Sequence, residues 1–337
     1  MRIVGIDLAK QVFHVCGMNK AGKVVLRKKL QRQDLLSFIA NIQADMIVME
    51  SCGGANYWSR EFTKLGHTVK LIAPQFVKPF VKSNKNDVID AEAICEAGLR
   101  PRMRFTVPKN ESQQDIQNLH RIRTRLVKSR TALVNEMRGL AGEYGIVLPK
   151  GIRVFKNRFL DTLNENGSLL SSLCYNTFLG LWSEFETLNN RILEYERELK
   201  QISKSSVCQR LMSVPGVGYL TATALIAATG DPRPFKNGRQ FAAWLGLVPK
   251  QYSTGGRNVL QGISKRGNSY IRKLLIHGAR VTLRYVGTKK DKRSVWATNL
   301  RHRKGMNLTS VALANKNART LWCILVGKDS YRTFAVA

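Results

Sequence analysis

The stretch Arg2-Ile3-Val4-Gly5-Ile6-Asp7 decides the fold class, because it is a short apolar run that ends in a carboxylate. A second run of the same kind, residues 46–49, ends at Glu50. Short apolar runs that are bounded by turn residues predict buried strands. Two buried strands that each end in an acid can bring their carboxylates together in one site.

Two further acids lie in the segment Lys85-Asn86-Asp87-Val88-Ile89-Asp90-Ala91, which begins a helix predicted over residues 87–99. Side chains three positions apart on a helix are neighbours, with about 5–6 Å between their Cβ atoms. Taken alone, Asp87 has the position of a helix N-cap and Asp90 that of a first-turn partner of the helix dipole. Together with Asp7 and Glu50, the pair favours a single divalent-metal site.

The elements around these acids alternate between strands and helices. The pattern predicts strands at 3–8, 12–17, 23–29, 46–50 and 69–73, and helices at 33–43, 57–65 and 87–99. This order is that of the ribonuclease H fold, also called RuvC-like, within an α/β plus α chain. In that fold carboxylates lie on the first strand, on the fourth strand and on the last helix, which are the positions of these four acids.

Such a site suits Mg²⁺, which prefers oxygen ligands and keeps open positions for water and phosphate. Two ions about 3.5–4 Å apart stabilise both the attacking and the leaving oxygen of a phosphodiester displacement. Close carboxylates repel one another, and a bound cation relieves that repulsion. Asp7, Glu50, Asp87 and Asp90 are therefore predicted to ligate Mg²⁺, with two ions per site.

The charge of the chain is strongly basic and unevenly placed. The 337 residues include 55 Lys and Arg against 23 Asp and Glu, a formal net charge of +32. Residues 206–337 alone contain 23 basic and three acidic side chains. Basic proteins of this kind bind polyanions, above all nucleic acid. The C-terminal third is therefore predicted to be the main nucleic-acid surface.

Cysteine usage and the N-terminus bear on the compartment. The six cysteines form no C-x-x-C pair and no cluster with zinc-ligand spacing, which is typical of small apolar core residues in a reducing compartment. The sequence begins with a predicted strand rather than a signal peptide, and no apolar run approaches the roughly 18 residues of a membrane span. These features predict a cytoplasmic, nucleoid-associated protein.

The order of the predicted elements and the uneven charge divide the chain into three predicted regions, at 1–106, 107–205 and 206–337.

The middle region, 107–205, is predicted to be helical, with apolar residues at heptad spacing, which is typical of a coiled coil. The first seam, which Arg130 interrupts, comprises Leu119, Leu126, Leu133 and Leu140, with Ile122, Met137 and Tyr144 beside it. The second seam comprises Leu181, Phe185, Leu188, Ile192, Tyr195, Leu199 and Ile202. An antiparallel hairpin that packs on itself and an arm for self-association both explain the pattern. The stretch between the seams is too irregular to assign.

The last region, 206–337, begins with a helix, Pro215-Gly216-Val217-Gly218 and a second helix, which is the helix-hairpin-helix pattern. Gly216 and Gly218 would let backbone N–H groups approach a phosphate; an ordinary helical packing unit is the alternative. Further on, a basic turn at 264–268 precedes a helix whose apolar side is predicted to include Ile271, Leu274, Leu275 and Val281. Phosphate contacts are expected from Arg257, Lys265, Arg266 and Arg272.

The segment Tyr252-Ser253-Thr254-Gly255-Gly256-Arg257 places a hydroxyl pair beside two glycines in the most basic region. Ser, Thr and Gly are common turn residues, so the segment alone predicts an exposed glycine loop. A nucleophilic serine here would need activation by a metal-bound water or a carboxylate, because no histidine is its neighbour in sequence.

Over nearly its whole length the chain resembles the DEDD-type, RuvC-like insertion-sequence transposases, which are bridge-RNA-guided serine recombinases. The resemblance is most specific in the segment from Lys85 to Ala91. The other matching segments are Gly5-Ile6-Asp7 with Ala9-Lys10, Glu50-Ser51-Cys52-Gly53, Pro215-Gly216-Val217-Gly218, Arg239-Gln240-Phe241-Ala242, Leu245-Gly246-Leu247-Val248-Pro249, Ser253-Thr254-Gly255-Gly256 and Ile263-Ser264-Lys265-Arg266-Gly267-Asn268.

The resemblance implies what each region does. Asp7, Glu50, Asp87 and Asp90 would bind Mg²⁺, the middle region would form a coiled coil, and Ser253 would attack DNA to give a phosphoserine link, with Thr254 as a one-residue alternative. Strands would then be exchanged through a junction. A non-coding guide (bridge) RNA from the element would select donor and target DNA, and the working particle would be a homo-oligomer, from dimer to tetramer.

Two other functions fit parts of the sequence. A metal-dependent Holliday-junction-type DNA nuclease would need only the four acids and would use water as the nucleophile, which leaves the serine segment as DNA-binding surface. Actin-like ATPases and sugar kinases share the fold class and also place an Asp after a Gly-Ile strand. They need a second glycine-rich phosphate loop and two related lobes, which the sequence lacks.

Overall fold

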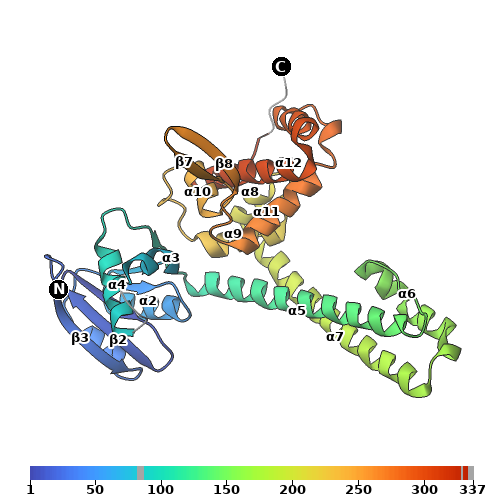
Figure 1. Ribbon diagram of the computed structural model, residues 1–337, viewed down its shortest axis with the longest axis horizontal. Helices are drawn as coiled ribbons and strands as arrows, with labels where there is room; N and C mark the ends of the chain where they lie inside the picture. Colours follow the sequence, from blue (N-terminus) through green and yellow to red (C-terminus); the bar gives the residue numbers. More distant parts are fainter. Residues whose placement is uncertain (82–86, 328, 333–337) are drawn as a thin grey trace. The chain divides into compact units, whose positions relative to one another are not determined.

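The computed structural model describes residues 1–81, 87–327 and 329–332 (Figure 1). It divides into two compact units, one of Met1–Gln114 with Ala228–Asp231 and one of Asp115–Ala227 with Pro232–Ala337. The first holds a mixed sheet with helices and the second is mostly helical, as the sequence predicts at this level. The predicted boundaries after residues 106 and 205 remain predictions. In the described part of the chain, no helix is long and apolar enough to cross a membrane.

The first unit is built on a mixed sheet with the strand order β3-β2-β1-β4-β5-β6. Strand β1 pairs antiparallel with β2 and parallel with β4, while β5 continues the parallel set and β6 returns antiparallel. The strands are β1 (Ile3–Asp7), β2 (Val12–Met18), β3 (Val24–Gln31), β4 (Ile47–Glu50), β5 (Val69–Ile72) and β6 (Phe105–Thr106). The short strand β6 is an addition to the predicted elements.

Helices cover both faces of this sheet (Figure 1). Val4, Ile6 and Phe13 point to one face and pack with α1 (Leu35–Ala40) and α2 (Ala55–Lys64). Ile3, Cys16 and Val48 point to the other face and pack against α4 (Asp87–Leu99). A helical turn, α3 (Pro74–Val77), adds Val77 to this second cluster. The alternation of side chains along each strand produces these two cores.

Helix α4 lies directly on β1 because glycines remove the side chains between them. A Cβ atom on Gly5 would lie 2.7 Å from the Ala91 carbonyl oxygen and 2.7 Å from Cys95 Sγ. A Cβ atom on Gly98 would likewise lie 2.5 Å from the Ile3 Cδ1 atom. Residue 98 of α4 therefore lies against the start of β1, and residues 91 and 95 of α4 lie against its middle. The helix runs back along the strand, and its first turn lies over the end of β1.

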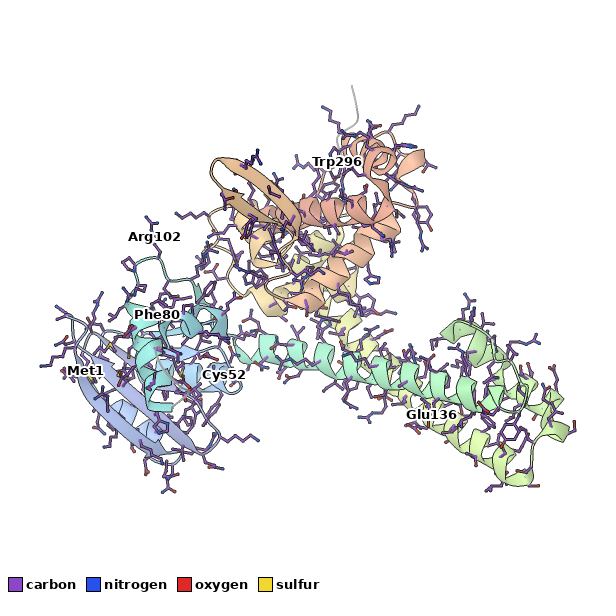
Figure 2. All side chains as sticks on the ribbon, viewed as in Figure 1. Met1, Cys52, Phe80, Arg102, Glu136 and Trp296 are labelled. Atoms are coloured by element: carbon purple, nitrogen blue, oxygen red, sulfur yellow. The ribbon has the colours of Figure 1, made fainter. Side chains whose placement is uncertain are left out.

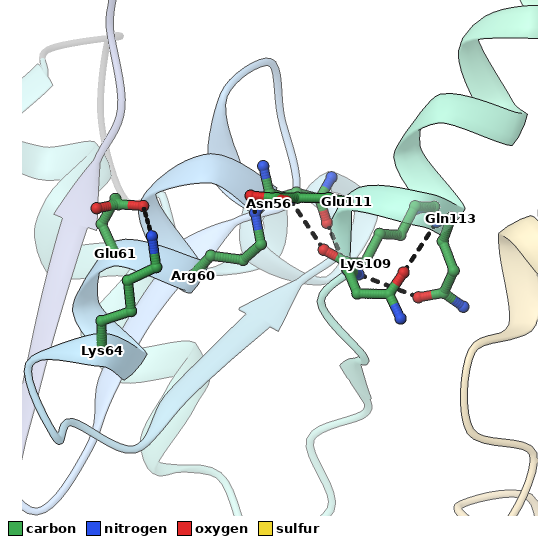
Figure 3. A network of polar contacts seen from close by, with 8 residues as sticks. Asn56, Arg60, Glu61, Lys64, Lys109, Glu111 and Gln113 are labelled. Atoms are coloured by element: carbon green, nitrogen blue, oxygen red, sulfur yellow. Dashed lines mark hydrogen bonds and ion pairs between the residues drawn. The ribbon is translucent and has the colours of Figure 1, made fainter.

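The start of α5 (Glu111–Gly142) is fixed to α2 by a polar network (Figure 3). The Lys109 backbone N–H donates to Asn56 Oδ1 at 2.9 Å, and Arg60 Nη1 donates to the Lys109 carbonyl at 3.0 Å. Asn110 and Gln113 then exchange hydrogen bonds between their side chains and backbone N–H groups. This reciprocal arrangement is a capping box, which fixes where the long helix begins.

In the second unit, α5, α6 (Ile152–Glu165) and α7 (Ser172–Ile202) share an aromatic core that includes Phe155, Phe159 and Trp182. The predicted heptad seams are buried only in part. Leu126 and Leu133 are buried, whereas Leu140 and Tyr144 are 42% and 43% exposed, so their assignment to the seam was wrong. Helix α5 is ending at these positions, and α6, which the sequence left unassigned, covers the neighbouring core instead.

Polar side chains join α5 to α7. Arg123 Nε donates to Glu196 Oε1 at 2.9 Å, and Arg130 Nη1 donates to Asn189 Oδ1 at 2.7 Å. Burial lowers the pKa of the Arg130 guanidinium, while Glu196 partly offsets this effect. Arg130 interrupts the apolar seam, as predicted, but Asn189 gives it a partner inside the chain.

The C-terminal helices are α8 (Ser206–Met212), α9 (Tyr219–Thr229), α10 (Gly238–Trp244), α11 (Ser269–Thr282) and α12 (Lys292–Val326), the last kinked at Gly305. On α11 the buried residues are Ile271, Leu275 and Ala279. Val281 is 52% exposed, so its predicted place on the apolar side was wrong. Positions 271, 275 and 279 follow the four-residue step of one helix face, and position 281 falls outside it.

His120 joins three helices in the interior of this unit. Its Nδ1 lies 3.0 Å from the Tyr270 hydroxyl of α11, and its Nε2 lies 3.0 Å from Thr223 Oγ1 of α9. Burial lowers the pKa of His120 to about 4, and the nearby Arg123 acts in the same direction. The ring is therefore neutral at physiological pH and serves as a hydrogen-bonded core residue.

We expect Gly5→Ala to lower the free energy of unfolding by about 1–3 kcal/mol, because the new methyl group would overlap the backbone of α4. Gly180→Ala is the matched control. Gly180 lies in the exposed part of α7, where an added Cβ would have nothing within 4 Å, so this change should stabilise by about 0.5–1 kcal/mol. Urea unfolding measures both, and equal effects of the two variants would contradict the close contact between α4 and β1.

Candidate functional site

The structure places two of the predicted acids side by side at one end of the sheet. Asp7 is the last residue of β1 and Glu50 the last of β4, one position beyond the register pair of Ile6 with Met49. Neighbouring strands are about 4.8 Å apart, so the two half-buried acids begin from adjacent positions on the same face. Asp7 shares that face with Gly5, which contacts α4.

Cys52 lies just past the end of β4 (Figure 2). The pKa of its thiol reflects the groups around it. Burial raises the pKa of its thiol, and the carboxylates of Glu50 and Asp7 raise it further. A thiol that senses both carboxylates must lie in the field of both. Cys52 therefore lies near the carboxylates at the ends of β1 and β4.

The third and fourth acids belong to α4. Asp90 is half-buried and directly precedes Ala91, the residue that touches Gly5, so it lies on the turn of α4 that rests on β1. Asp87 begins the helix, and its side chain lies outside the described residues. Among the side chains that are described, no group of three His, Cys, Asp or Glu has the spacing of a metal site. The structure thus places Asp7 and Glu50 on adjacent strand ends and Asp90 on the turn of α4 that rests on β1, and the described side chains form no complete ligand set.

The donor chemistry of this corner fits Mg²⁺. Its acids supply carboxylate oxygens, the hard ligands that Mg²⁺ uses in proteins. Burial is the main cause of the raised pKa of the Cys52 thiol, and the carboxylates of Glu50 and Asp7 add to it. Asp7, Glu50 and Asp90 are therefore of the right chemical type to ligate Mg²⁺.

Ser253 and Thr254 lie on a strand, which corrects the prediction of an exposed loop. Strands β7 (Pro249–Thr254) and β8 (Arg257–Ile263) form an antiparallel hairpin whose two-residue turn is Gly255-Gly256. Both glycines have positive φ, 54° and 78°, as the tight turns that match strand twist require. Only the glycines are in the turn, so the strand fixes the direction of both hydroxyl groups.

The Ser253 hydroxyl is held by two amide side chains that the sequence analysis missed. Ser253 Oγ donates to Asn258 Oδ1 at 2.8 Å, directly across the hairpin, and Gln251 Nε2 donates to Ser253 Oγ at 2.9 Å. Gln251 Nε2 also donates to Asn258 Oδ1 at 3.1 Å. The available signal was the two-residue step from Gln251 to Ser253, which puts both on one face of a strand.

The basic turn at 264–268 is fixed by close backbone packing. A Cβ on Gly246 would lie 2.0 Å from the Arg266 carbonyl oxygen, and Lys265 has a positive φ of 55°. Arg272 Nη1 donates to the carbonyl oxygens of Leu245 at 3.0 Å and of Arg266 at 3.1 Å. Arg272 therefore supports the turn, while Lys265 and Arg266 are exposed on it. Arg257 is likewise exposed, at the start of β8.

The two glycines of the helix-hairpin-helix pattern differ in their surroundings. Gly216, with a φ of 88°, packs so closely on α11 that a Cβ there would lie 2.6 Å from the Gly278 carbonyl oxygen. Gly218 is exposed, and a Cβ added to it would have nothing within 4 Å. Gly216 thus permits helix packing, and Gly218 has the open surroundings that a phosphate contact needs.

Comparisons with known proteins identify the family of the chain. The family described as "Transposase IS116/IS110/IS902 family" matches residues 208–294, and a "Transposase" family of DEDD type matches residues 4–145. The chain is 47% identical to "Transposase for insertion sequence element IS1111A" of Coxiella burnetii, covering 98% of this chain and 92% of the relative. It is 47% identical to "Probable family 20 transposase" of Pseudomonas aeruginosa, covering 98% of both chains. It is 43% identical to "Transposase for insertion sequence element IS1328" of Yersinia enterocolitica, covering 96% of both.

These matches define the class of the protein as a transposase, an enzyme that cleaves and rejoins DNA. The chain belongs to the transposase IS116/IS110/IS902 family, the insertion-sequence transposases of IS110 type. The predicted family and enzyme class are thereby confirmed.

We expect Arg272→Ala to lower the free energy of unfolding by about 1–3 kcal/mol, because two carbonyl groups lose a charged donor. Lys273→Ala removes the same charge from an exposed neighbouring position of α11, and it should change stability by less than about 0.5 kcal/mol. Chemical unfolding of the two variants makes the comparison. Unchanged stability with lost DNA affinity in Arg272→Ala would instead assign Arg272 to phosphate binding.

Proposed function

We propose that this transposase is an RNA-guided DNA recombinase that cuts and exchanges strands through a covalent phosphoserine intermediate in the presence of Mg²⁺. The observation that carries the proposal is the Ser253 hydroxyl, held between Asn258 and Gln251 on an exposed hairpin of the basic unit. The corner of acids in the first unit supplies the second part of the chemistry.

The strand order supports a ribonuclease H-like assignment for the first unit. Strands β1, β2 and β3 form an antiparallel meander, and β4 and β5 follow in parallel on the other side of β1. That topology places the ends of β1 and β4 next to each other at the centre of the sheet. Helix α4, lying on β1, brings a third element to the same end.

In this proposal Asp7, Glu50, Asp87 and Asp90 bind the metal. When bound, Mg²⁺ would neutralise the charge of a phosphodiester and stabilise the oxygen that leaves. The residues of the chain set the conditions for this: the ends of β1 and β4 fix two carboxylates on adjacent strands, and α4 adds Asp90 from above. The half-burial of Asp7, Glu50 and Asp90 limits competition from water.

The serine step balances as a phosphoryl transfer. The bond between Ser253 Oγ and phosphorus forms while one phosphorus–oxygen bond of the DNA backbone breaks. The hydroxyl proton leaves to water, and the departing deoxyribose oxygen takes a proton from water. Asn258 and Gln251 are amides that cannot accept this proton, so their contacts position the Ser253 oxygen rather than deprotonate it.

A guide RNA and self-association complete the proposal. The basic surface favours phosphate backbones without regard to sequence, so base pairing with a guide would supply the specificity. Exposed apolar side chains beyond the packed core of α5–α7, Val147 at 87% and Leu173 at 79%, support association of copies through this region. A dimer or tetramer would bring together the several active sites that strand exchange needs.

A metal-dependent junction nuclease is the second candidate. The corner formed by Asp7, Glu50 and Asp90 favours it, because these acids require no serine to direct a water molecule at a phosphate. The two mechanisms differ in their products, since hydrolysis leaves free DNA ends and the serine mechanism leaves DNA bound to protein.

We expect wild-type protein, expressed with the flanking non-coding DNA of its element and mixed with donor and target duplexes and Mg²⁺, to form a labelled DNA–protein adduct on a denaturing gel. Ser253→Ala should abolish the adduct, because the attacking oxygen is gone. Thr254→Ala, one residue away on the opposite face of β7, is the matched control and should retain it. Asp90→Asn should abolish all cleavage. Cleaved but unattached DNA from both wild type and Ser253→Ala would establish hydrolysis instead.

A further inference from the structure

The strand register places His14 and Lys29 in line with the acids Glu50 and Asp7. Asp7 of β1 lies opposite His14 of β2, and His14 lies opposite Lys29 of β3. Residues directly opposite each other in antiparallel strands point to the same face of the sheet. Glu50, Asp7, His14 and Lys29 therefore form one line across β4, β1, β2 and β3, about 14 Å long at about 4.8 Å per strand.

Contacts with α4 establish which face this is. One step along the strands, Gly5 is opposite Cys16 and Cys16 is opposite Arg27. Gly5 touches α4, and Arg27 Nε donates to Glu92 Oε1 of α4 at 2.6 Å. The line from Asp7 to Lys29 is therefore on the α4 face, beside the first turn of the helix.

This face is hollowed beside the helix. A cavity there is lined by His14, Val15, Cys16, Arg27, Lys28, Lys29 and Ala91. Arg27 forms an ion pair with Glu92. Lys29 is exposed. His14 is half-buried between Asp7 and Lys29. His14 and Lys29 thus border one cavity, and the strand register places Asp7 next to His14 in the same line.

We propose that His14 and Lys29 form a subsite for the sugar-phosphate backbone of a DNA strand, next to the phosphate that the acids act on. The subsite rests on the proposed function for the position of that phosphate. Lys29 is two strands, about 10 Å, from Asp7. A phosphate bound by Lys29 would therefore belong to a nucleotide of the same strand close to the one at the acids. A strand laid across β1, β2 and β3 would pass from acids that act on one phosphate to groups that hold the next ones.

The chain contains a matched control for this proposal. Lys28 is adjacent to Lys29 on β3 but points to the opposite face, where its Nζ lies 4.6 Å from the centre of the Phe38 ring of α1. Substituting either lysine removes one positive charge from the same exposed strand. Only Lys29 shares the line with Asp7, so a general charge effect and a subsite predict different results.

The test measures binding of a labelled DNA duplex from the end of the element, with Ca²⁺ in place of Mg²⁺, over a series of salt concentrations. We expect Lys29→Gln to weaken binding and to reduce the log–log salt slope by about 0.9, the share of one duplex phosphate contact. Lys28→Gln should leave both unchanged. His14→Ala alone should also weaken binding. Combined with Lys29→Gln it should add little, since both side chains hold the same DNA strand.

Equal behaviour of Lys28→Gln and Lys29→Gln would overturn the subsite, and so would a slope change seen with the guide RNA but absent with DNA. The adduct assay of wild type separates this from the proposed function. An adduct together with equal slopes means that the subsite alone is wrong. A reduced slope in Lys29→Gln without any adduct means that the strand is bound where proposed but the serine mechanism is wrong.

Discussion

The close contact of α4 with β1 is the constraint on which the candidate acidic site depends. Gly5 and Gly98 allow the helix backbone to approach the strand without intervening side chains. Because the helix runs back along β1, its first turn arrives where β1 and β4 end. A larger residue at Gly5 would lift α4 and separate Asp90 from Asp7 and Glu50. In the proposed site, two small residues thus set how closely α4 can bring Asp90 to the ends of β1 and β4.

A second constraint of the same kind shapes the serine hairpin. Gly255 and Gly256, both at positive φ, close a two-residue turn that sets Ser253 opposite Asn258. The cross-strand hydrogen bond follows from that register, and Gln251 reaches both partners from the same face. In each unit, glycine geometry fixes backbone register, and register fixes the polar side chains that the proposed chemistry uses.

The sequence predicted the first unit well, because its strands are buried and end in acids, and its helices bury one face each. The sequence did not predict the elements and residues whose burial follows no regular spacing of apolar residues. Strand β7 is exposed on all its residues, so no apolar alternation distinguished it from a loop, and the partners of Ser253 stayed hidden. Leu140 and Tyr144 kept the heptad spacing but lie where α5 is ending, and Val281 lies off the buried face of α11. Spacing predicts a helix face, whereas only the tertiary structure shows which part of that face is covered.

Binding of Mn²⁺ to the full chain tests whether acids from β1, β4 and α4 form one divalent-cation site. Electron paramagnetic resonance of free Mn²⁺ should show tight, saturable binding to wild type that Asp7→Asn and Glu50→Gln each weaken at least tenfold. Asp45→Asn, which removes a surface acid paired with Arg2, should bind as wild type does. Equal Mn²⁺ binding by wild type, Asp7→Asn and Glu50→Gln would exclude a divalent-cation site formed by these acids.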